Sequence, residues 1–412
     1  MSKKTQWAVM VNLFLLLFLG LGDNQLISPL LPLIQKSFHV DVTVVGTLVV
    51  AYSVAAALSS LVSGALSDHY GRRVFLIGSA LAFAVFSLLI HWVSSFGILL
   101  VLRFLVGLCA GAISTCTIAL ASDIFPYEIR GRAIGTISSA YFAALILGVP
   151  LGSLAADQFE WRTIFPGIAV IALLIALSNW IYLPVRKMEF EYGETDAMFL
   201  RARIKSFGTF LSRRDLLAAV VMAFFVSGGI VGLITYIGVW LHTTFQVPVR
   251  LIGIIFLLSG VVSFIGAPLG GILADRWGKR RVSIASNVLL ALSMMLVPLL
   301  HWGVLLFVVF GFLSLSAAFR QGPITALISE LVEERERGSF IALRNIFSQL
   351  GIASSAFLGG VLYVHWGYSG VAALCTIFTL VVVWLLAHYL EEPNAVAAGS
   401  ASSLISVPKG SH

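Results

Sequence analysis

The sequence predicts an all-α membrane protein in which twelve transmembrane helices form two six-helix bundles. Three observations predict this fold. Apolar residues make up 59% of the chain and charged residues 11%, with a mean hydropathy of +1.00, which does not suit the surface of a water-soluble protein. Twelve apolar stretches reach about 18 residues or more, the length that crosses a hydrocarbon core of about 30 Å. Many residues of the first half recur 207 positions later in the second half.

The twelve stretches are predicted to be helices, because lipid offers the backbone no hydrogen-bond partner and because their apolar residues do not alternate as in barrel strands. The repeat places six of them in each half. They cover residues 7–34, 43–66, 74–93, 97–122, 132–156, 163–184, 215–241, 250–273, 281–301, 304–329, 339–363 and 369–390.

The charge pattern divides the chain into four segments. We expect an N-terminal bundle (1–184), a charged cytoplasmic connector (185–214), a C-terminal bundle (215–390) and a disordered cytoplasmic tail (391–412). With both termini in the cytoplasm, the loops on the outer side hold only Lys36, Arg162 and Arg250 as basic residues. This inside bias explains the net charge of +7 better than nucleic-acid binding does.

A ten-residue loop occurs once in each half, between the second and third helices. Residues 64–73 read Gly-Ala-Leu-Ser-Asp-His-Tyr-Gly-Arg-Arg, and residues 271–280 read Gly-Ile-Leu-Ala-Asp-Arg-Trp-Gly-Lys-Arg. The repeated loop resembles the signature of the major facilitator superfamily, and the likeness extends over nearly all of residues 5–390. The resemblance implies two bundles related by a pseudo-two-fold axis along the membrane normal, a substrate cavity between them, and transport by rocking of the halves.

These loops are predicted to form two conformational latches, in which Arg72 binds Asp123 and Lys279 binds Glu330. The first glycine of each loop is expected to permit close helix approach and the second a tight turn. In the family such clusters are associated with holding the outward-open state; ordinary surface ion pairs are the alternative. The latch residues are Gly64, Asp68, Gly71, Arg72, Arg73 and Asp123 in the first half, and Gly271, Asp275, Gly278, Lys279, Arg280 and Glu330 in the second.

Function is expected where the halves differ. Of the 19 acidic residues, only Asp23 falls well inside a predicted span, and its equivalent in the second half is Ile230. Arg103 in the fourth helix is also unmatched, since its equivalent is Phe310. Both residues lie in the outer half of the membrane, which makes an ion pair between them geometrically possible.

The run from Arg103 to Gly107 resembles the family's fourth-helix motif, whose arginine is implicated in proton coupling. We hypothesise that Asp23 carries the proton and that Arg103 favours its ionised form in one conformation only. The alternatives are a permanent Asp23–Arg103 strut and an Asp23 that caps a break before Pro29.

Other polar and aromatic residues inside the spans are candidates for the wall of the substrate cavity. Arg320 suits an anionic or polar substrate, or a cluster of helix-end carbonyls, and Arg344 enters the eleventh helix beside two of the candidates. The aromatic candidates could equally serve in packing. The predicted cavity residues are Asn24, Gln25, Tyr52, Tyr141, Tyr236, Trp240, Arg320, Gln321, Asn345 and Gln349.

The fifth helix contains Gly148, Pro150 and Gly152, which are predicted to bend it and to allow close contact with its partner. The run resembles the antiporter motif of the family's twelve-helix drug:proton antiporter branch, in the form seen in multidrug, sugar and purine exporters. It departs from the usual Gly-Pro-x-x-Gly-Gly, because Val149 separates Gly148 from Pro150. The resemblance therefore implies export without fixing the substrate.

The predicted function is proton-coupled export of a small organic molecule or drug by alternating access across a bacterial-type inner membrane. The alternatives are a proton symporter or uniporter for a sugar or organic anion, a lipid flippase, and a membrane ligand sensor. We expect no enzyme activity, no cofactor besides the proton gradient and no metal site, because catalytic and phosphate-loop motifs are missing and the three cysteines lack ligand spacing. The expected partners are the small-molecule substrate, protons and membrane lipids, around a monomer.

Overall fold

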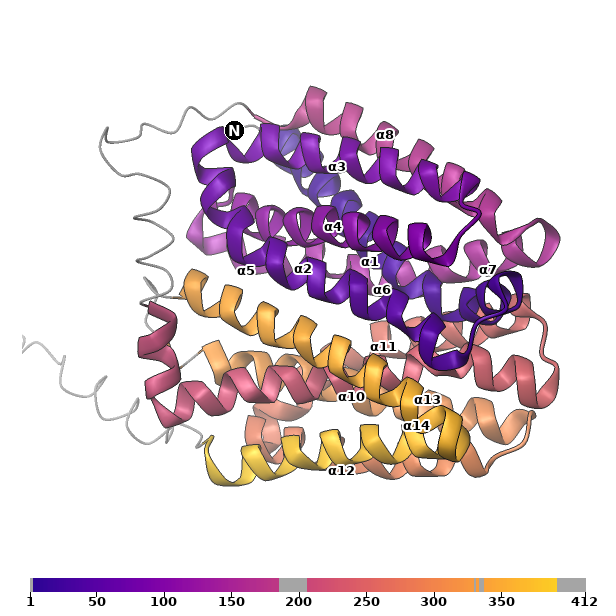
Figure 1. Ribbon diagram of the computed structural model, residues 1–412. Helices are drawn as coiled ribbons and strands as arrows, with labels where there is room; N and C mark the ends of the chain where they lie inside the picture. Colours follow the sequence, from indigo (N-terminus) through magenta and orange to yellow (C-terminus); the bar gives the residue numbers. More distant parts are fainter. Residues whose placement is uncertain (1–2, 185–205, 330, 333–336, 391–412) are drawn as a thin grey trace, which may run out of the picture.

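The computed structural model describes residues 3–184, 206–329, 331–332 and 337–390, and the elements in these ranges are helical. Figure 1 shows two groups of helices, the N-terminal half in indigo to magenta and the C-terminal half in pink to yellow. The N-terminal half contains α1 (Lys3–Phe38), α2 (Val42–Tyr70), α3 (Arg72–Leu89), α4 (Phe96–Ile124), α5 (Tyr127–Ser138), α6 (Ala140–Ala143), α7 (Val149–Gln158) and α8 (Ile164–Tyr182). The C-terminal half contains α10 (Arg214–Phe245), α11 (Val249–Trp277), α12 (Lys279–Leu296), α13 (Val304–Ser329) and α14 (Arg337–His388).

Eleven helical segments in the described ranges are long and apolar enough to cross a membrane. One of them, α14, joins two helices across Gly367, whose φ of 63° is not helical. The chain therefore crosses twelve times, and the predicted fold class is confirmed. Gly367 lies between the predicted spans 339–363 and 369–390.

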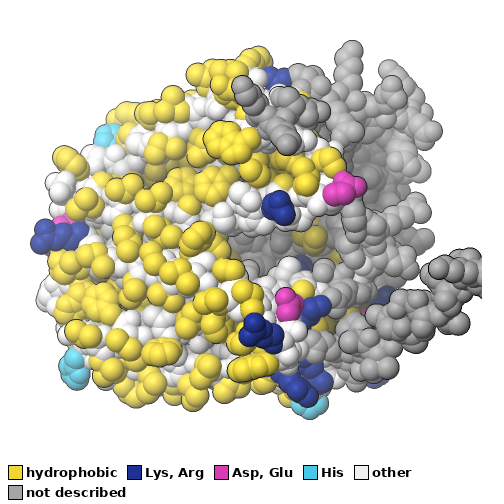
Figure 2. All heavy atoms as spheres, turned by 180° about the vertical axis from the view of Figure 1, so that it is seen from behind, with side chains coloured by type: hydrophobic (Ala, Val, Ile, Leu, Met, Phe, Trp, Pro, Cys, Tyr) yellow, Lys and Arg dark blue, Asp and Glu magenta, His cyan; other side chains and the backbone are white. Residues whose placement is uncertain are grey.

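The outer surface is that of an integral, multi-pass membrane protein. On the face in Figure 2, hydrophobic side chains form a broad band and most charged side chains lie toward the two ends of the molecule. Large apolar residues stay exposed along the helices, including Leu174, Phe264 and Leu292. In lipid these side chains meet acyl chains, so their exposure carries no hydrophobic penalty.

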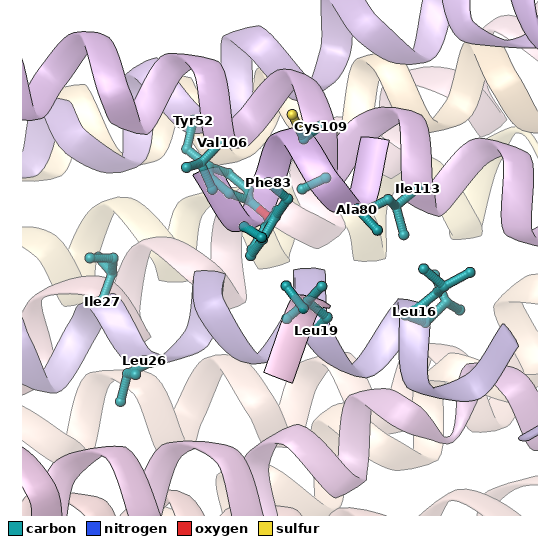
Figure 3. Close-up of a cluster of buried hydrophobic side chains, with 14 of the residues drawn as sticks. Leu16, Leu19, Leu26, Ile27, Tyr52, Ala80, Phe83, Val106, Cys109 and Ile113 are labelled. Carbon is teal, nitrogen blue, oxygen red and sulfur yellow. The ribbon is translucent and has the colours of Figure 1, made fainter. Parts of the chain in front are cut away.

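The helices of the N-terminal half approach one another closely because small residues lie at their contacts. A Cβ atom on Gly107 of α4 would lie 2.4 Å from the carbonyl oxygen of Tyr52 in α2, so a larger residue there requires the two helices to move apart. Figure 3 shows Tyr52 beside Val106 of α4, with Phe83 of α3 and Leu19 of α1 in the same buried cluster. The Tyr52 hydroxyl donates a hydrogen bond to the Gly20 carbonyl of α1, at 3.0 Å.

The two ends of the bundles differ. We call the end that carries the turns at Gly71 and Gly278 the loop end, and the opposite end the far end. At the far end, the Ser28 hydroxyl of α1 lies 3.2 Å from the Thr235 carbonyl oxygen of α10, and the Thr43 hydroxyl of α2 donates to the Gly360 carbonyl of α14 at 2.9 Å. These contacts join the two halves, so the far end is closed.

The fifth crossing is not a continuous α-helix. Residues Ala144–Gly148 form a π-helical turn between α6 and α7, and Pro150 follows after Val149. Proline lacks the N–H that would continue the regular hydrogen-bond pattern, and single π turns inside helices are frequent at functional positions. Gly152 allows α1 to approach, because a Cβ atom there would lie 2.4 Å from Leu26 Cδ1.

Candidate functional site

A cavity of about 480 Å³ lies between the two halves, and Figure 2 shows a hollow there. Its walls come from both halves: α1, α5 and α6 on one side, and α10, α11, α13 and α14 on the other. The wall extends to Gly135 and Ile328, close to the loop end. Since the far end is closed, the cavity is reached from the loop end.

Seven of the ten predicted cavity residues line this cavity. They are Asn24, Gln25, Tyr141, Arg320, Gln321, Asn345 and Gln349. The Gln25 side chain of α1 lies next to the Tyr141 hydroxyl of the broken fifth helix. Serine side chains add polar groups, so the wall is mixed rather than purely apolar.

The other three predicted cavity residues are buried elsewhere and serve packing. Tyr52 lies inside the N-terminal half, over the Arg103 guanidinium at 4.8 Å from the ring centroid. Tyr236 is fully buried and donates a hydrogen bond to the Ala356 carbonyl. Trp240 stacks on Tyr368, with ring centroids 4.6 Å apart. A helix that is apolar all round gives no sequence pattern from which to tell these faces apart.

Arg320 is the most deeply buried charge in the cavity wall, with 2% of its surface exposed. Its Nη1 donates to Asn287 Oδ1 at 2.9 Å, and its Nη2 donates to the Val226 carbonyl oxygen at 3.0 Å. Both acceptors are uncharged, and Nε has no hydrogen-bond partner among the described residues. The guanidinium is therefore held in place without being neutralised.

Asn287, in α12, contacts a residue of the cavity wall and was missed by the sequence analysis. It is fully buried, donates its own amide to the Ser283 carbonyl at 2.7 Å, and so presents its oxygen to Arg320. An amide in the middle of an apolar span is the signal that could have identified it.

Arg344, in α14, also lines the cavity. Its Nε is buried and has no hydrogen-bond partner in the part of the chain that the structure describes. Among the residues that line the cavity, none is an aspartate or a glutamate. The described wall therefore carries two positive groups and no negative group.

Asp23 and Arg103 are in direct contact. Asp23 Oδ2 accepts a hydrogen bond from Arg103 Nη1 at 2.7 Å, and their side chains are 1% and 0% exposed. The second carboxylate oxygen and two guanidinium nitrogens have no partner within the described ranges. Asp23 does not itself line the cavity, whereas the next two residues, Asn24 and Gln25, do. The pair thus lies inside the N-terminal half, directly behind the cavity wall.

The loop of the N-terminal half contains one of the two predicted ion pairs. Arg72 Nη1 lies 2.8 Å from Asp123 Oδ2. Its counterpart cannot be compared, because Glu330 lies outside the described residues, as does the side chain of Asp68; Asp275 is exposed. Gly71 and Gly278 adopt φ angles of 88° and 93°, so both occupy the turn conformation that favours glycine.

Two of the predicted latch residues have a role that the sequence did not reveal. Arg73 donates to the Trp180 carbonyl at the end of α8. Arg280 donates to the Leu386 carbonyl at 2.9 Å and to the Ala387 carbonyl, at the end of α14. Trp180 and Ala387 are themselves 207 positions apart. The last residue of each loop, Arg73 or Arg280, therefore caps the C-terminal end of the last helix of its half, where cations are favoured.

The expected close approach at the first glycine of the loop is wrong for Gly271, because a Cβ atom there would meet nothing within 4 Å. The preceding Gly270 makes that contact instead, since its Cβ would lie 2.6 Å from Phe319 Cα of α13. The face of α11 that contacts α13 is therefore centred one residue earlier than predicted, which corresponds to a rotation of about 100° around the helix axis.

Two bundles of membrane-crossing helices around a central cavity that is accessible from one end form the architecture of a secondary transporter. The family model described as Major Facilitator Superfamily matches residues 13–264 and 220–407. The chain belongs to this family. It is accordingly a secondary transporter rather than an enzyme, and its ligand is a small molecule.

The chain is similar to relatives and solved structures over most of its length. It is 27% identical over 362 residues to an uncharacterised MFS-type transporter, YwfA, of Bacillus subtilis (strain 168), covering 87% of this chain and 86% of the relative. It is 24% identical over 355 residues to YbcL of the same organism, covering 86% and 88%. A crystal structure of a D-xylose-proton symporter superposes with a TM-score of 0.78 at 16% identity, over 94% of this chain and 98% of that one. At that identity the likeness supports the fold alone.

Proposed function

We propose that this transporter exports a small organic molecule from the cytoplasm in exchange for protons. The observation that carries the proposal is the buried Asp23–Arg103 pair behind the cavity wall. An acid at this depth is costly in the membrane and is typical of proton relays in transporters.

The orientation follows from the charges. Basic residues of the sequence gather in segments at the loop end, which the positive-inside rule assigns to the cytoplasm, together with both termini. The cavity is then open to the cytoplasm, the side from which an exporter loads. Because the relatives are bacterial, we assign the protein to the cytoplasmic membrane.

Proton coupling rests on the position of Asp23 in α1. Protonation removes its charge and weakens the hydrogen bond to Arg103 of α4, while Arg103 keeps its contact with the Tyr52 ring. The same helix carries Asn24 and Gln25 in the cavity wall and Ser28 in the far-end contact. A proton on Asp23 therefore acts on a helix that both binds substrate and closes the far end.

The broken fifth helix supports the export direction. The π turn before Pro150 lies against α1 and α11, one helix from each half. Its sequence resembles the antiporter motif, and we assign the chain to the drug:proton antiporter branch on that resemblance.

The test is proton flux in proteoliposomes under an imposed pH gradient, with a panel of organic anions, sugars, nucleosides and cationic drugs. We expect one compound class to cause proton flux in the wild type. Asp23→Asn should abolish this compound-dependent flux. Glu160→Gln is the matched control and should retain flux, because its ion pair with Arg162 stays within the N-terminal half. Full compound-dependent flux in Asp23→Asn, with normal elution of the purified variant, excludes coupling through Asp23.

A second candidate is a proton symporter or uniporter for an organic anion, which the two arginines in the cavity favour. The direction of compound movement under an imposed pH gradient separates these mechanisms. An antiported compound moves against the proton flow and a symported compound moves with it. A uniported compound does not respond to the gradient.

A further inference from the structure

We propose that the cavity binds organic anions, and that Arg320 and Arg344 recognise a carboxylate or phosphate group of the substrate. The inference deepens the proposed function, on which it rests for the role of this cavity in transport. It concerns the class of substrate rather than its coupling to protons.

The first step is the charge of the wall. Two guanidinium groups and no carboxylate line the cavity within the described part of the chain. A cationic compound entering this space would meet like charge without a compensating acid. An anion would meet opposite charge in a site of low dielectric constant, where the attraction is stronger than in water.

The second step is the state of Arg320. Among the described residues, its two hydrogen-bond acceptors are an amide and a backbone carbonyl, which are both uncharged, and its Nε has no acceptor. A buried ion without an opposite charge is strongly unfavourable. The arrangement fixes the direction of the guanidinium and leaves its charge to be neutralised by a ligand, which arginine does well for planar carboxylates and for phosphates.

The third step concerns the rest of the substrate. The wall near the arginines presents amides, among them Gln349, whose Oε1 is buried and unpartnered in the described ranges. Tyr141 and Phe142 add aromatic faces from the fifth crossing. The volume of about 480 Å³ falls within the size of small-molecule sites. The substrate is therefore a small anion with an apolar or aromatic body and at least one further polar group.

Arg103 does not compete for this role. Its charge is already matched by Asp23, and it lies in the interior of the other half. An anion in the cavity consequently interacts with Arg320 and Arg344 alone among the buried arginines described above.

The experiment measures thermal unfolding of the purified protein in detergent with matched pairs of probes. Each pair sets an anion against a neutral compound with the same ring: nicotinate with nicotinamide, benzoate with benzamide, and phenyl phosphate with phenol. We expect at least one anion to raise the unfolding midpoint more than its neutral partner. Preference for the carboxylates or for the phosphate identifies which of the two groups the site takes.

The variants assign the effect to the two arginines. Arg320→Gln and Arg344→Gln should each weaken the affinity for the anion by about ten- to a hundredfold, the range for a hydrogen bond to a charged group. Arg320→Lys should retain part of the affinity, because it keeps the charge. Arg281→Gln, an exposed arginine of α12 outside the cavity wall, is the control and should bind as the wild type does. If Arg320→Gln fails to fold, Arg344→Gln decides, since no hydrogen bond of its guanidinium to another described residue is lost.

The proposal is wrong if no anion stabilises the protein more than its neutral partner, or if both arginine variants keep the full anion effect. Because the measurement involves no gradient, its result is independent of proton coupling. Anion binding without proton flux would overturn antiport and leave the anion site intact. Proton-coupled transport of a neutral or cationic compound, without anion binding, would support proton coupling and overturn the anion site.

Discussion

Arg103 and Arg320 are both buried in the membrane, one in each half, and their surroundings are opposite. Arg103 is neutralised by Asp23 and covered by Tyr52. Arg320 is held by two uncharged acceptors at the wall of the central cavity. The equivalent positions of the repeat hold apolar residues: Phe310 corresponds to Arg103, and Ile113 corresponds to Arg320. The duplication supplies the scaffold, and Arg103 and Arg320 are buried cations in different settings that have no counterpart in the other copy. On our proposals, the N-terminal half handles the proton and the C-terminal half handles the substrate.

The largest effect is expected from Arg103→Leu. At neutral pH it leaves the Asp23 carboxylate buried without a cation, which should lower the free energy of unfolding by about 3–5 kcal/mol. The measurement is denaturant unfolding of the purified protein in detergent micelles. The double variant Asp23→Leu with Arg103→Leu should recover most of the loss, because no charge is then stranded. A double variant as unstable as Arg103→Leu would mean that packing, and not charge, explains the loss.

Arg320→Met should have a smaller effect on stability, about 1–3 kcal/mol. The substitution removes the cation together with its need for neutralisation, and the two acceptors that lose their donor, the Asn287 oxygen and the Val226 carbonyl oxygen, are both uncharged. Asn287→Leu in the same chain should restore part of the loss. The same unfolding assay applies, and a loss greater than that of Arg103→Leu would contradict the contrast between the two sites.

Gly107→Ala probes the packing around Arg103 without touching a charge. The added Cβ would lie 2.4 Å from the Tyr52 carbonyl oxygen, so α2 has to move away from α4. We expect a loss of about 1–2 kcal/mol, toward the lower end of the range for overpacked cores. Gly311→Ala, in α13, is the control, because nothing lies within 4 Å of a Cβ there. Equal stability of the two variants would show that the α2–α4 contact tolerates the displacement.

Most of the fold could be predicted from the sequence, because length and apolar composition determine which segments cross a bilayer. The contact between Asp23 and Arg103 was anticipated as geometrically possible, since both are isolated charges at similar depth. Arg72 and Asp123 could be paired because the repeat aligned their loop with the end of the fourth helix. In each case a rare polar residue in an apolar background supplied the signal.

The orientation of side chains around each helix could not be predicted. Tyr236 and Trp240 lie in α10, whose residues are apolar on most sides, so their sequence positions do not separate a cavity face from a packed one. The caps made by Arg73 and Arg280 depend on where the last helix of each half ends in space. Whether Gly270 or Gly271 contacts α13 depends on the rotation of α11 about its axis. Two adjacent glycines in the sequence do not indicate that rotation.

The contact between Ser28 and Thr235 at the far end joins residues 207 positions apart, which occupy the same place in the two copies of the repeat. Residues that meet their own equivalents lie on a two-fold axis, as at the centre of a symmetric dimer interface. The seal between the halves is thus isologous. Neither half needs a separate lid, because the same surface, used twice, closes on itself.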